Sequence, residues 1–239
     1  MSLPEAADGG TQAFVNERHR LLHYRLVASG IVEAIGQLVE PNGGRRPVVL
    51  DHGCGEALAA RDVARRCARL YLCEAKASLR GELAAHFADS ADVQVIAPLE
   101  VADIAEASLD LVVAQSPVQD LTPAEFASAL RLWRRALKPQ GRLLIADVVP
   151  KGLSPMADPL ALLRFGWRGG FLFAALPVIV RAVFARLSRL RAEASRVVGY
   201  DEKEMIALLD EAGFKAERHR PNLGHDQTRM AFLATPSRA

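Results

Sequence analysis

Two acids and two glycines stand near the ends of successive hydrophobic runs, in a spacing that could bind a nucleoside. The first run, VVL, ends at Asp51, and Gly53 and Gly55 follow. Glycines let a backbone turn tightly and approach a ligand closely. The next run, LYLC, ends at Glu74, about 20 residues further on, where an acid hydrogen-bonds ribose hydroxyls. The pattern therefore predicts a ligand that carries a ribose.

The acid that precedes the glycines narrows the ligand class. Asp51 would repel a pyrophosphate, because two anions at short range repel each other. A ligand bearing an ammonium and a sulfonium would instead be attracted. We therefore expect a ligand that is cationic near the glycine loop and carries its ribose further out.

An alternation of strands and helices would position these residues. Strands that alternate with helices form a parallel sheet, and ligands bind at the carboxyl ends of its strands. The expected strands are PVVLD, LYLC, VQVI, LDLVVA and RLLIADVV, and the expected helices span 56–67, 76–87 and 122–137. The last of these helices opens with a capping box formed by Thr122 and Glu125.

The two ends of the chain add further elements. Residues 12–40 have a helical pattern, and residues 201–212 form a second helix that Asp201 caps and Gly213 stops. The segments FKAERHR and RMAFLAT then follow with only a polar loop between them. That loop is too short for a parallel crossover, so the two segments should pair antiparallel.

Five segments resemble, in order and spacing, the motifs of the class I S-adenosylmethionine-dependent methyltransferases of the small single-domain, type 11-like kind. They are VVLDHGCGEA, LYLCEAK, SLDLVVAQSPVQDL, ALRLWRRALKPQGRLLIADVV and MIALLDEAGFKAERHR. Together they cover roughly residues 45–150 and 201–236.

The resemblance implies an α/β fold and a domain organisation. The expected fold is a doubly wound, mostly parallel seven-stranded sheet of the Rossmann-like methyltransferase type, with a terminal antiparallel strand and a helical insert. A single domain would span 1–239, with a helical cap at 12–40, the cofactor-binding core at 45–150, an insert or substrate lid at 151–200, and the last helix and strand pair at 201–236.

The resemblance also implies a reaction. S-adenosylmethionine would donate a methyl group to a small, lipophilic acceptor, with O- or N-methylation favoured over C-methylation. No catalytic residue is assigned and no metal is expected. The expected cofactor-binding residues are Asp51, Gly53, Cys54, Gly55, Glu74 and Gln115.

Three departures from the family pattern leave alternatives open. Ala57 replaces the third glycine, and we interpret it as part of the first helical turn, where alanine is harmless. His52 replaces an aliphatic residue. No aspartate follows the third strand, so backbone groups of residues 97–100 would hold adenine. A catalytically degenerate binding protein is one alternative. A nicotinamide-dependent oxidoreductase is another, and Asp51 argues against it.

Two histidines and a tyrosine near the predicted site are candidates for a general base. His52, His23 and Tyr24 are the three groups considered for an acceptor that carries a proton. His19 and His23 lie four residues apart on the first helix, but no third metal ligand is evident. With Tyr24 and Arg25, they could instead cap the cofactor site.

The segment 151–200 is long for a connection between a strand and the last helix. Residues 164–196 carry seven arginines against one acid, beside Trp167, Phe171 and Phe173. A basic amphipathic helix with aromatic residues is a membrane-surface pattern. Three roles stay open: a lid that buries its apolar stripe over the site, a contact with membrane or lipid substrate, and a homodimer face.

Composition sets broader limits. The net charge of +2 gives no reason to expect nucleic acid as a partner. The three cysteines fit no zinc or CxxC motif, and reduced thiols favour a cytoplasmic protein that could be peripheral to a membrane. The N-terminal residues do not resemble a signal peptide.

Overall fold

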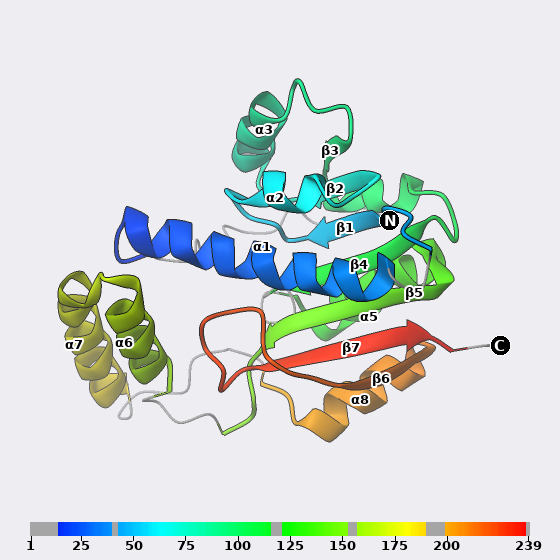
Figure 1. Cartoon of the computed structure of the whole chain (residues 1–239). Helices are drawn as coiled ribbons and strands as arrows, with labels where there is room; N and C mark the ends of the chain where they lie inside the picture. The colour runs from blue at the N-terminus through cyan, green and yellow to red at the C-terminus, as the bar shows by residue number, and fades with distance from the viewer. Residues whose placement is uncertain (1–13, 40–42, 116–120, 153–156, 190–198, 238–239) are drawn as a thin grey trace.

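The computed structural model has one seven-stranded sheet with helices on both faces (Figure 1). It describes residues 14–39, 43–115, 121–152, 157–189 and 199–237, with only the backbone for 39 and 182–189. The strand order is β3-β2-β1-β4-β5-β7-β6. The strands are β1 (Val48–His52), β2 (Arg69–Cys73), β3 (Val93–Ile96), β4 (Leu109–Gln115), β5 (Leu137–Val148), β6 (Phe214–His219) and β7 (Met230–Pro236).

The pairing confirms the expected fold class. Strands β1 to β5 pair in parallel, and β7 runs antiparallel to both β5 and β6. The FKAERHR and RMAFLAT segments therefore form the antiparallel pair expected from their short loop. The order reverses between β1 and β4, so a ligand crevice is expected at the carboxyl ends of these two strands.

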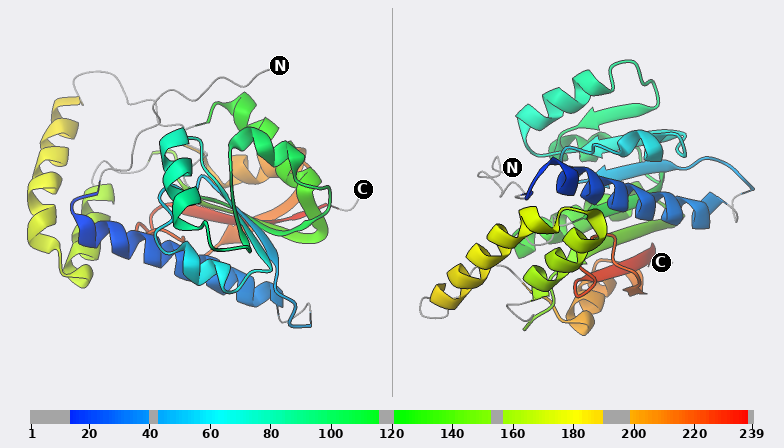
Figure 2. Two further views of the ribbon diagram at one scale, coloured as in Figure 1. Left: turned by 90° about the horizontal axis from the view of Figure 1, so that it is seen from above. Right: turned by 60° about the vertical axis from the view of Figure 1, so that its left-hand side comes forward.

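The helices cover both faces of the sheet. One face is covered by α1 and α2, and the other by α5 and α8 (Figures 1 and 2). The helices are α1 (Glu17–Val39), α2 (Ala60–Ala64), α3 (Ala77–His86), α5 (Pro123–Ala136), α6 (Ala157–Gly169), α7 (Leu172–Arg189) and α8 (Glu202–Glu211), with a 3-10 helix, η1 (Pro98–Asp103), after β3.

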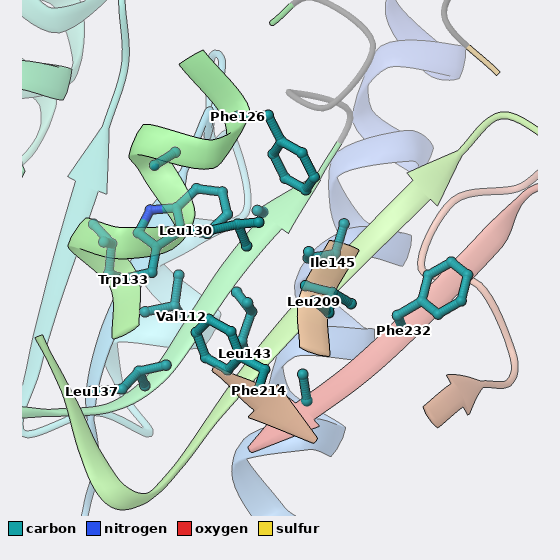
Figure 3. Close-up of a cluster of buried hydrophobic side chains, with 14 of the residues drawn as sticks. Val112, Phe126, Leu130, Trp133, Leu137, Leu143, Ile145, Leu209, Phe214 and Phe232 are labelled. Carbon is teal, nitrogen blue, oxygen red and sulfur yellow. The ribbon is translucent and has the colours of Figure 1, made fainter. Parts of the chain in front are cut away.

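Large apolar side chains hold α5 and α8 against the sheet (Figure 3). Trp133 and Leu209 are fully buried and come from these two helices. Strand β4 is buried over nearly its whole length because helices cover it from both sides. The capping box of α5 is present: Thr122 donates its N–H to Glu125 Oε2 at 2.8 Å. This core fixes where the carboxyl ends of the strands lie.

Two expectations about element limits are wrong. The helix expected at 56–67 is reduced to α2, because residues 56–59 form turns. The KPQG segment, expected to separate α5 from the fifth strand, lies inside β5 instead. The strand thus begins directly after the helix, and its first residue, Leu137, pairs with Leu109.

Helices α6 and α7 form a hairpin beside the first turns of α1, away from α5 and α8 (Figures 1 and 2). The apolar stripe, which the lid role would bury over the site, is exposed at its described members. Leu176 is 39% exposed and Val180 is 50% exposed. Phe171 and Ala175 face inward instead. Within the described residues, no helix is long and apolar enough to cross a membrane.

Candidate active site

The loop after β1 leaves the sheet through two residues with left-handed backbone. Gly53 has a φ of 78° and Gly55 a φ of 61°, a region in which residues with a Cβ are strained. The N–H groups of Gly53 and Cys54 both donate to the carbonyl of Cys73, at 2.8 and 3.2 Å. Hydrogen bonds of the backbone thus fasten the loop to the end of β2.

Gly55 is restricted by a neighbour as well as by its backbone. A Cβ at this position would lie 2.8 Å from the hydroxyl oxygen of Tyr24 in α1. That hydroxyl accepts the N–H of Glu56 at 3.1 Å, and Arg20 forms an ion pair with the Glu56 carboxylate at 2.8 Å. Helix α1 therefore lies directly on the glycine loop.

Glu74 is buried at the end of β2, where it also holds the loop. Its Oε2 accepts the N–H of Gly55 at 3.0 Å, and its Oε1 accepts the N–H of Lys76 at 2.8 Å. Arg80 donates to the carbonyl of Glu74 at 2.9 Å. Each carboxylate oxygen has a second lone pair, so Glu74 can still accept a hydroxyl of a ligand.

Asp51 lies beside Glu74 at the carboxyl edge of the sheet. Desolvation, and then the charge of Glu74, raise the pKa of Asp51 to about 7. Two carboxylates in a poorly hydrated site repel each other, and a cationic ligand would relieve this repulsion. The edge thus has the electrostatics expected of a site for an ammonium or sulfonium group.

Ala57 corrects one interpretation of the sequence. Its φ is 44°, so it has the left-handed backbone of a loop and is not in a first helical turn. Its N–H donates to Cys54 at 3.2 Å, and its carbonyl accepts from Ala60 at 2.8 Å. These bonds hold a conformation that costs alanine about 1–2 kcal/mol. The third glycine of the family pattern thus has a backbone reason, and this chain carries the strain.

The remaining predicted residues have different surroundings. Cys54 is buried, and burial raises the pKa of its thiol well above its usual value, so it is an inert packing group. Gln115 ends β4 beside Ala146 of β5. Residues 116–120 lie outside the described part of the chain. The N–H of Ala97, considered for adenine, donates to Glu100 Oε2 at 2.5 Å.

Two of the three candidate bases are poorly suited. His52 packs edge-on against Trp133, with ring centroids 5.1 Å apart, and its buried Nδ1 has no hydrogen-bond partner among the residues that the structure describes. Burial raises the pKa of Tyr24 to about 12, so its hydroxyl holds its proton. His23, the third candidate, lies beside Tyr24 with ring centroids 5.3 Å apart.

A cluster of rings joins α1 to the α6–α7 hairpin and to the loop between β6 and β7. His19 stacks on Phe171 at 5.0 Å, and Phe165 stacks on His225 at 4.7 Å. His23 lies 6.3 Å from His225. Burial is the largest of the causes that lower the pKa of His19 and His23 to about 4, so both are uncharged near neutrality.

The polar atoms of this ring cluster are incompletely paired. His19 Nδ1 accepts the N–H of Val15 at 3.2 Å, while His19 Nε2 is buried without a partner among the described residues. His23 Nδ1 is buried and unpaired in the same way. Buried polar atoms of this kind usually meet a ligand or water. Of the four residues expected to cap the site, Tyr24 contacts the loop, the two histidines enter the cluster, and Arg25 is exposed.

A polar network follows the end of β5, which sequence reasoning did not find. Asp147 has a φ of 64°, and its N–H donates to Asn222 Oδ1 at 2.9 Å. Arg229 contacts Asp147 at 3.2 Å and Asp158 of α6 at 3.4 Å. The network ties the β6–β7 loop to β5 and to the hairpin. Sequence reasoning also missed Phe165 and His225 of the ring cluster, because neither residue lies in a recognisable motif.

Comparisons with known proteins agree with this geometry. A family model described as a methyltransferase domain matches residues 50–145. A search of curated protein sequences finds no relative. Solved structures with the same fold include a putative type 11 methyltransferase from Sulfolobus solfataricus, at 16% identity and a TM-score of 0.52, covering 84% of this chain and 90% of that one.

Two further structures are similar over nearly the whole chain. Magnesium protoporphyrin IX methyltransferase from Synechocystis PCC 6803, solved with bound S-adenosylhomocysteine, has 15% identity and a TM-score of 0.55, covering 95% of this chain and 90% of that one. A Leishmania major S-adenosylmethionine-dependent methyltransferase has 14% identity and a TM-score of 0.55, with 94% and 78% covered. Other matches are longer: the chain spans 50% and 54% of two of them.

Proposed function

The chain belongs to the class I S-adenosylmethionine-dependent methyltransferases, with a type 11 domain over residues 50–145, and we propose that it methylates a small, lipophilic acceptor at oxygen or nitrogen. S-adenosylmethionine is its methyl donor. The observation that carries the proposal is the meeting of Asp51, Glu74 and the glycine loop at one sheet edge, with a cluster of rings beside it.

Each expected cofactor residue has a proposed task. The Asp51 carboxylate would attract the cationic end of the cofactor, and Glu74 would accept its ribose hydroxyls. Gly53, Cys54 and Gly55 would let the backbone approach the ligand, and Gln115 would face the methionine end. When bound, the cofactor supplies a methyl group on a positively charged sulfur. The residues described here would orient this group toward the acceptor, and alignment supplies most of the catalysis in such a reaction.

The ring cluster supports an apolar acceptor. Phe165 and Phe171 come from the α6–α7 hairpin, and His19 and His23 come from α1. Tyr24 places α1 against the glycine loop, so this cluster lies next to the proposed cofactor site. An acceptor with an apolar body and one hydrogen-bonding group would match the rings and the imidazole nitrogens that have no partner in the described part of the chain.

We assign His23 as the group that accepts the acceptor's proton when the acceptor is a hydroxyl. It is uncharged near neutrality, and its buried Nδ1 is unpaired among the described residues. A pKa of about 4 makes it a weak base, so proton transfer would accompany methyl transfer and not precede it. An amine acceptor that is already deprotonated would need no such base.

The two alternative functions have less support. Ala57 and the missing acid after the third strand were the reasons to consider a degenerate binding protein, but Ala57 keeps the left-handed backbone that the loop requires. A nicotinamide cofactor would place its pyrophosphate near Asp51, at an edge that already holds two carboxylates. The lid role of residues 151–200 is supported only by the inward face of the hairpin, where Phe171 and Ala175 are buried.

A series of acceptors tests the proposal. Phenols and anilines with alkyl tails of increasing length would be incubated with the protein and S-adenosylmethionine, and release of S-adenosylhomocysteine would be measured; anilines are the amine acceptors because they are uncharged near neutrality. We expect kcat/KM to rise with tail length. Turnover of polar acceptors alone would contradict a lipophilic substrate. The His23→Gln variant should lose turnover of phenols while amines react normally, and an equal loss with both would remove His23 from proton transfer.

A further inference from the structure

The outer face of α6 combines apolar and basic side chains. Leu160, Arg164, Trp167 and Arg168 recur at helical spacing, and all four are exposed. The indole of Trp167 is 73% exposed. Large aromatic side chains at this exposure are uncommon on a soluble surface unless something covers them.

Helix α7 continues the same surface. Phe173, Leu176 and Val180 lie at positions i, i+3 and i+7, and Phe173 is 86% exposed. Phe171 and Ala175 occupy the opposite side, where they are buried against the rest of the protein. The exposed side of α7 therefore cannot also close over the sheet while this packing holds. We call the exposed side chains of the two helices the hairpin face.

The charge of the hairpin face has one sign. Arg164, Arg168 and Arg181 are exposed on it. The two helices contain one acid, Asp158, which is partly buried and forms an ion pair with Arg229. An apolar surface with arginines and no exposed acid matches an anionic partner.

We propose that the hairpin face binds the surface of an anionic phospholipid membrane. Trp167, Phe173 and Val180 would enter the boundary between headgroups and acyl chains, and the arginines would contact lipid phosphates. A second copy of the chain fits less well, because a twofold contact would set this basic face against itself. The helices would lie on the membrane, since none of those described could cross it.

The attachment of the hairpin connects this surface to the proposed active site. Arg18 donates to the carbonyl of Gly169, and His19 stacks on Phe171, so the hairpin is held by the first turns of α1. Tyr24, one turn further along α1, contacts the glycine loop. Docking the hairpin face would thus hold the carboxyl edge of the sheet near the membrane.

Vesicle binding by the full chain tests the proposal directly. The probes are vesicles of phosphatidylcholine alone and of phosphatidylcholine with 30 mol% phosphatidylglycerol, assayed by flotation. We expect binding to the anionic vesicles and little to the neutral ones. Trp133 is fully buried, so tryptophan quenching by brominated lipids would report on Trp167. The Trp167→Phe variant should abolish this quenching.

Paired variants separate the hairpin face from general charge and hydrophobicity. The triple variant Arg164→Glu, Arg168→Glu, Arg181→Glu should bind anionic vesicles about 100-fold more weakly or worse, since each basic residue contributes about fivefold. Its control changes Arg65, Arg66 and Arg69, which are exposed near the start of β2, to glutamate. Phe173→Ser should also weaken binding, whereas Leu99→Ser, at a residue 58% exposed in η1, should not.

Three outcomes would overturn the proposal. They are no binding of the unaltered chain to anionic vesicles, equal binding to neutral vesicles, and equal losses in the charge variant and its control. A concentration-dependent dimer that Phe173→Ser dissociates would assign the hairpin face to a second copy instead. Cofactor affinity, measured by calorimetry, should stay unchanged in every hairpin variant, so this test is independent of the acceptor assignment.

Discussion

The glycine loop and the α6–α7 hairpin contrast in how they are held. The loop is fastened by backbone hydrogen bonds to Cys73, by the Glu74 carboxylate and by Tyr24 above it. The hairpin is attached through its inner side, by Phe171 and its neighbours, and leaves its other side exposed. The loop is already shaped for a ligand, whereas the hairpin face lacks a partner within the described chain. Changes in each region should therefore affect different measurements.

The largest expected effect is from Gly55→Val. The new Cβ would lie 2.8 Å from the Tyr24 hydroxyl oxygen, and the valine would have to adopt the φ of +61° of the glycine that it replaces. We expect calorimetry to detect no binding of S-adenosylhomocysteine, while binding to anionic vesicles persists. The matched control is Gly81→Val in α3, where a Cβ would meet nothing within 4 Å.

Combining Gly55→Ala with Tyr24→Phe separates steric contact with the Tyr24 hydroxyl from backbone strain at residue 55. Tyr24→Phe removes the hydroxyl that Gly55→Ala would contact, but it leaves the positive φ. If the double variant recovers most of the cofactor affinity lost by Gly55→Ala, then steric contact dominates. If it recovers none, backbone strain dominates. Normal affinity in Gly55→Val would show that the loop does not bind the cofactor.

Phe171→Ala should weaken vesicle binding and leave cofactor binding nearly intact, which is the reverse of the result expected for Gly55→Val. The ring is 3% exposed and stacks on His19, so its loss should cost about 3–5 kcal/mol of local packing. We expect faster proteolysis within α6 and α7 and weaker vesicle binding, with cofactor affinity changed less than about twofold. Phe173→Ala, which removes an exposed ring two residues further along, is the control for proteolysis: it should leave the proteolysis rate unchanged although it weakens vesicle binding. A large loss of cofactor affinity in Phe171→Ala would show that the two regions are coupled through α1.

Glu74→Ala should weaken cofactor binding by about 1–3 kcal/mol, because a hydrogen bond to a charged acceptor is lost. Glu74 also accepts the N–H groups of Gly55 and Lys76, so its loss should affect the folded loop as well as the ligand. Denaturant unfolding should thus show a loss of similar size. Glu74→Gln keeps an acceptor and should be milder in both measurements.

The pKa of Asp51 predicts that cofactor affinity depends on pH. A cationic ligand favours the ionised carboxyl, so affinity should rise with pH up to about 7, by at most tenfold per unit, and then level off. Because the folded state holds this proton more tightly than the unfolded state, the contribution of Asp51 to the free energy of unfolding should decrease as the pH rises from 4 to 7. Calorimetry across this range should show the rise, and Asp51→Asn should remove it.

The sequence predicted the region around the glycine loop better than the hairpin and the ring cluster. The fold and the spacing of Asp51, the glycines and Glu74 depend on backbone geometry, which hydrophobic periodicity and glycines report. The roles of these residues remain predictions. The ring cluster could not be predicted, because Phe165 and His225 come together only through tertiary packing. Periodicity could not tell which face of α7 the rest of the chain covers, and the structure leaves Leu176 39% exposed.

The smallest expected effect is from Ala57→Gly, which tests whether the loop carries strain. Glycine would relieve about 1–2 kcal/mol of left-handed strain. It would also lose about 0.8 kcal/mol from a buried methyl group and about 0.4–1 kcal/mol through unfolded-state entropy. These terms nearly cancel, so denaturant unfolding should change by less than about 1 kcal/mol. Ala57→Val keeps the φ of 44° and adds β-branching, so it should be clearly destabilising. Equal stability of all three proteins would show that this position is not left-handed.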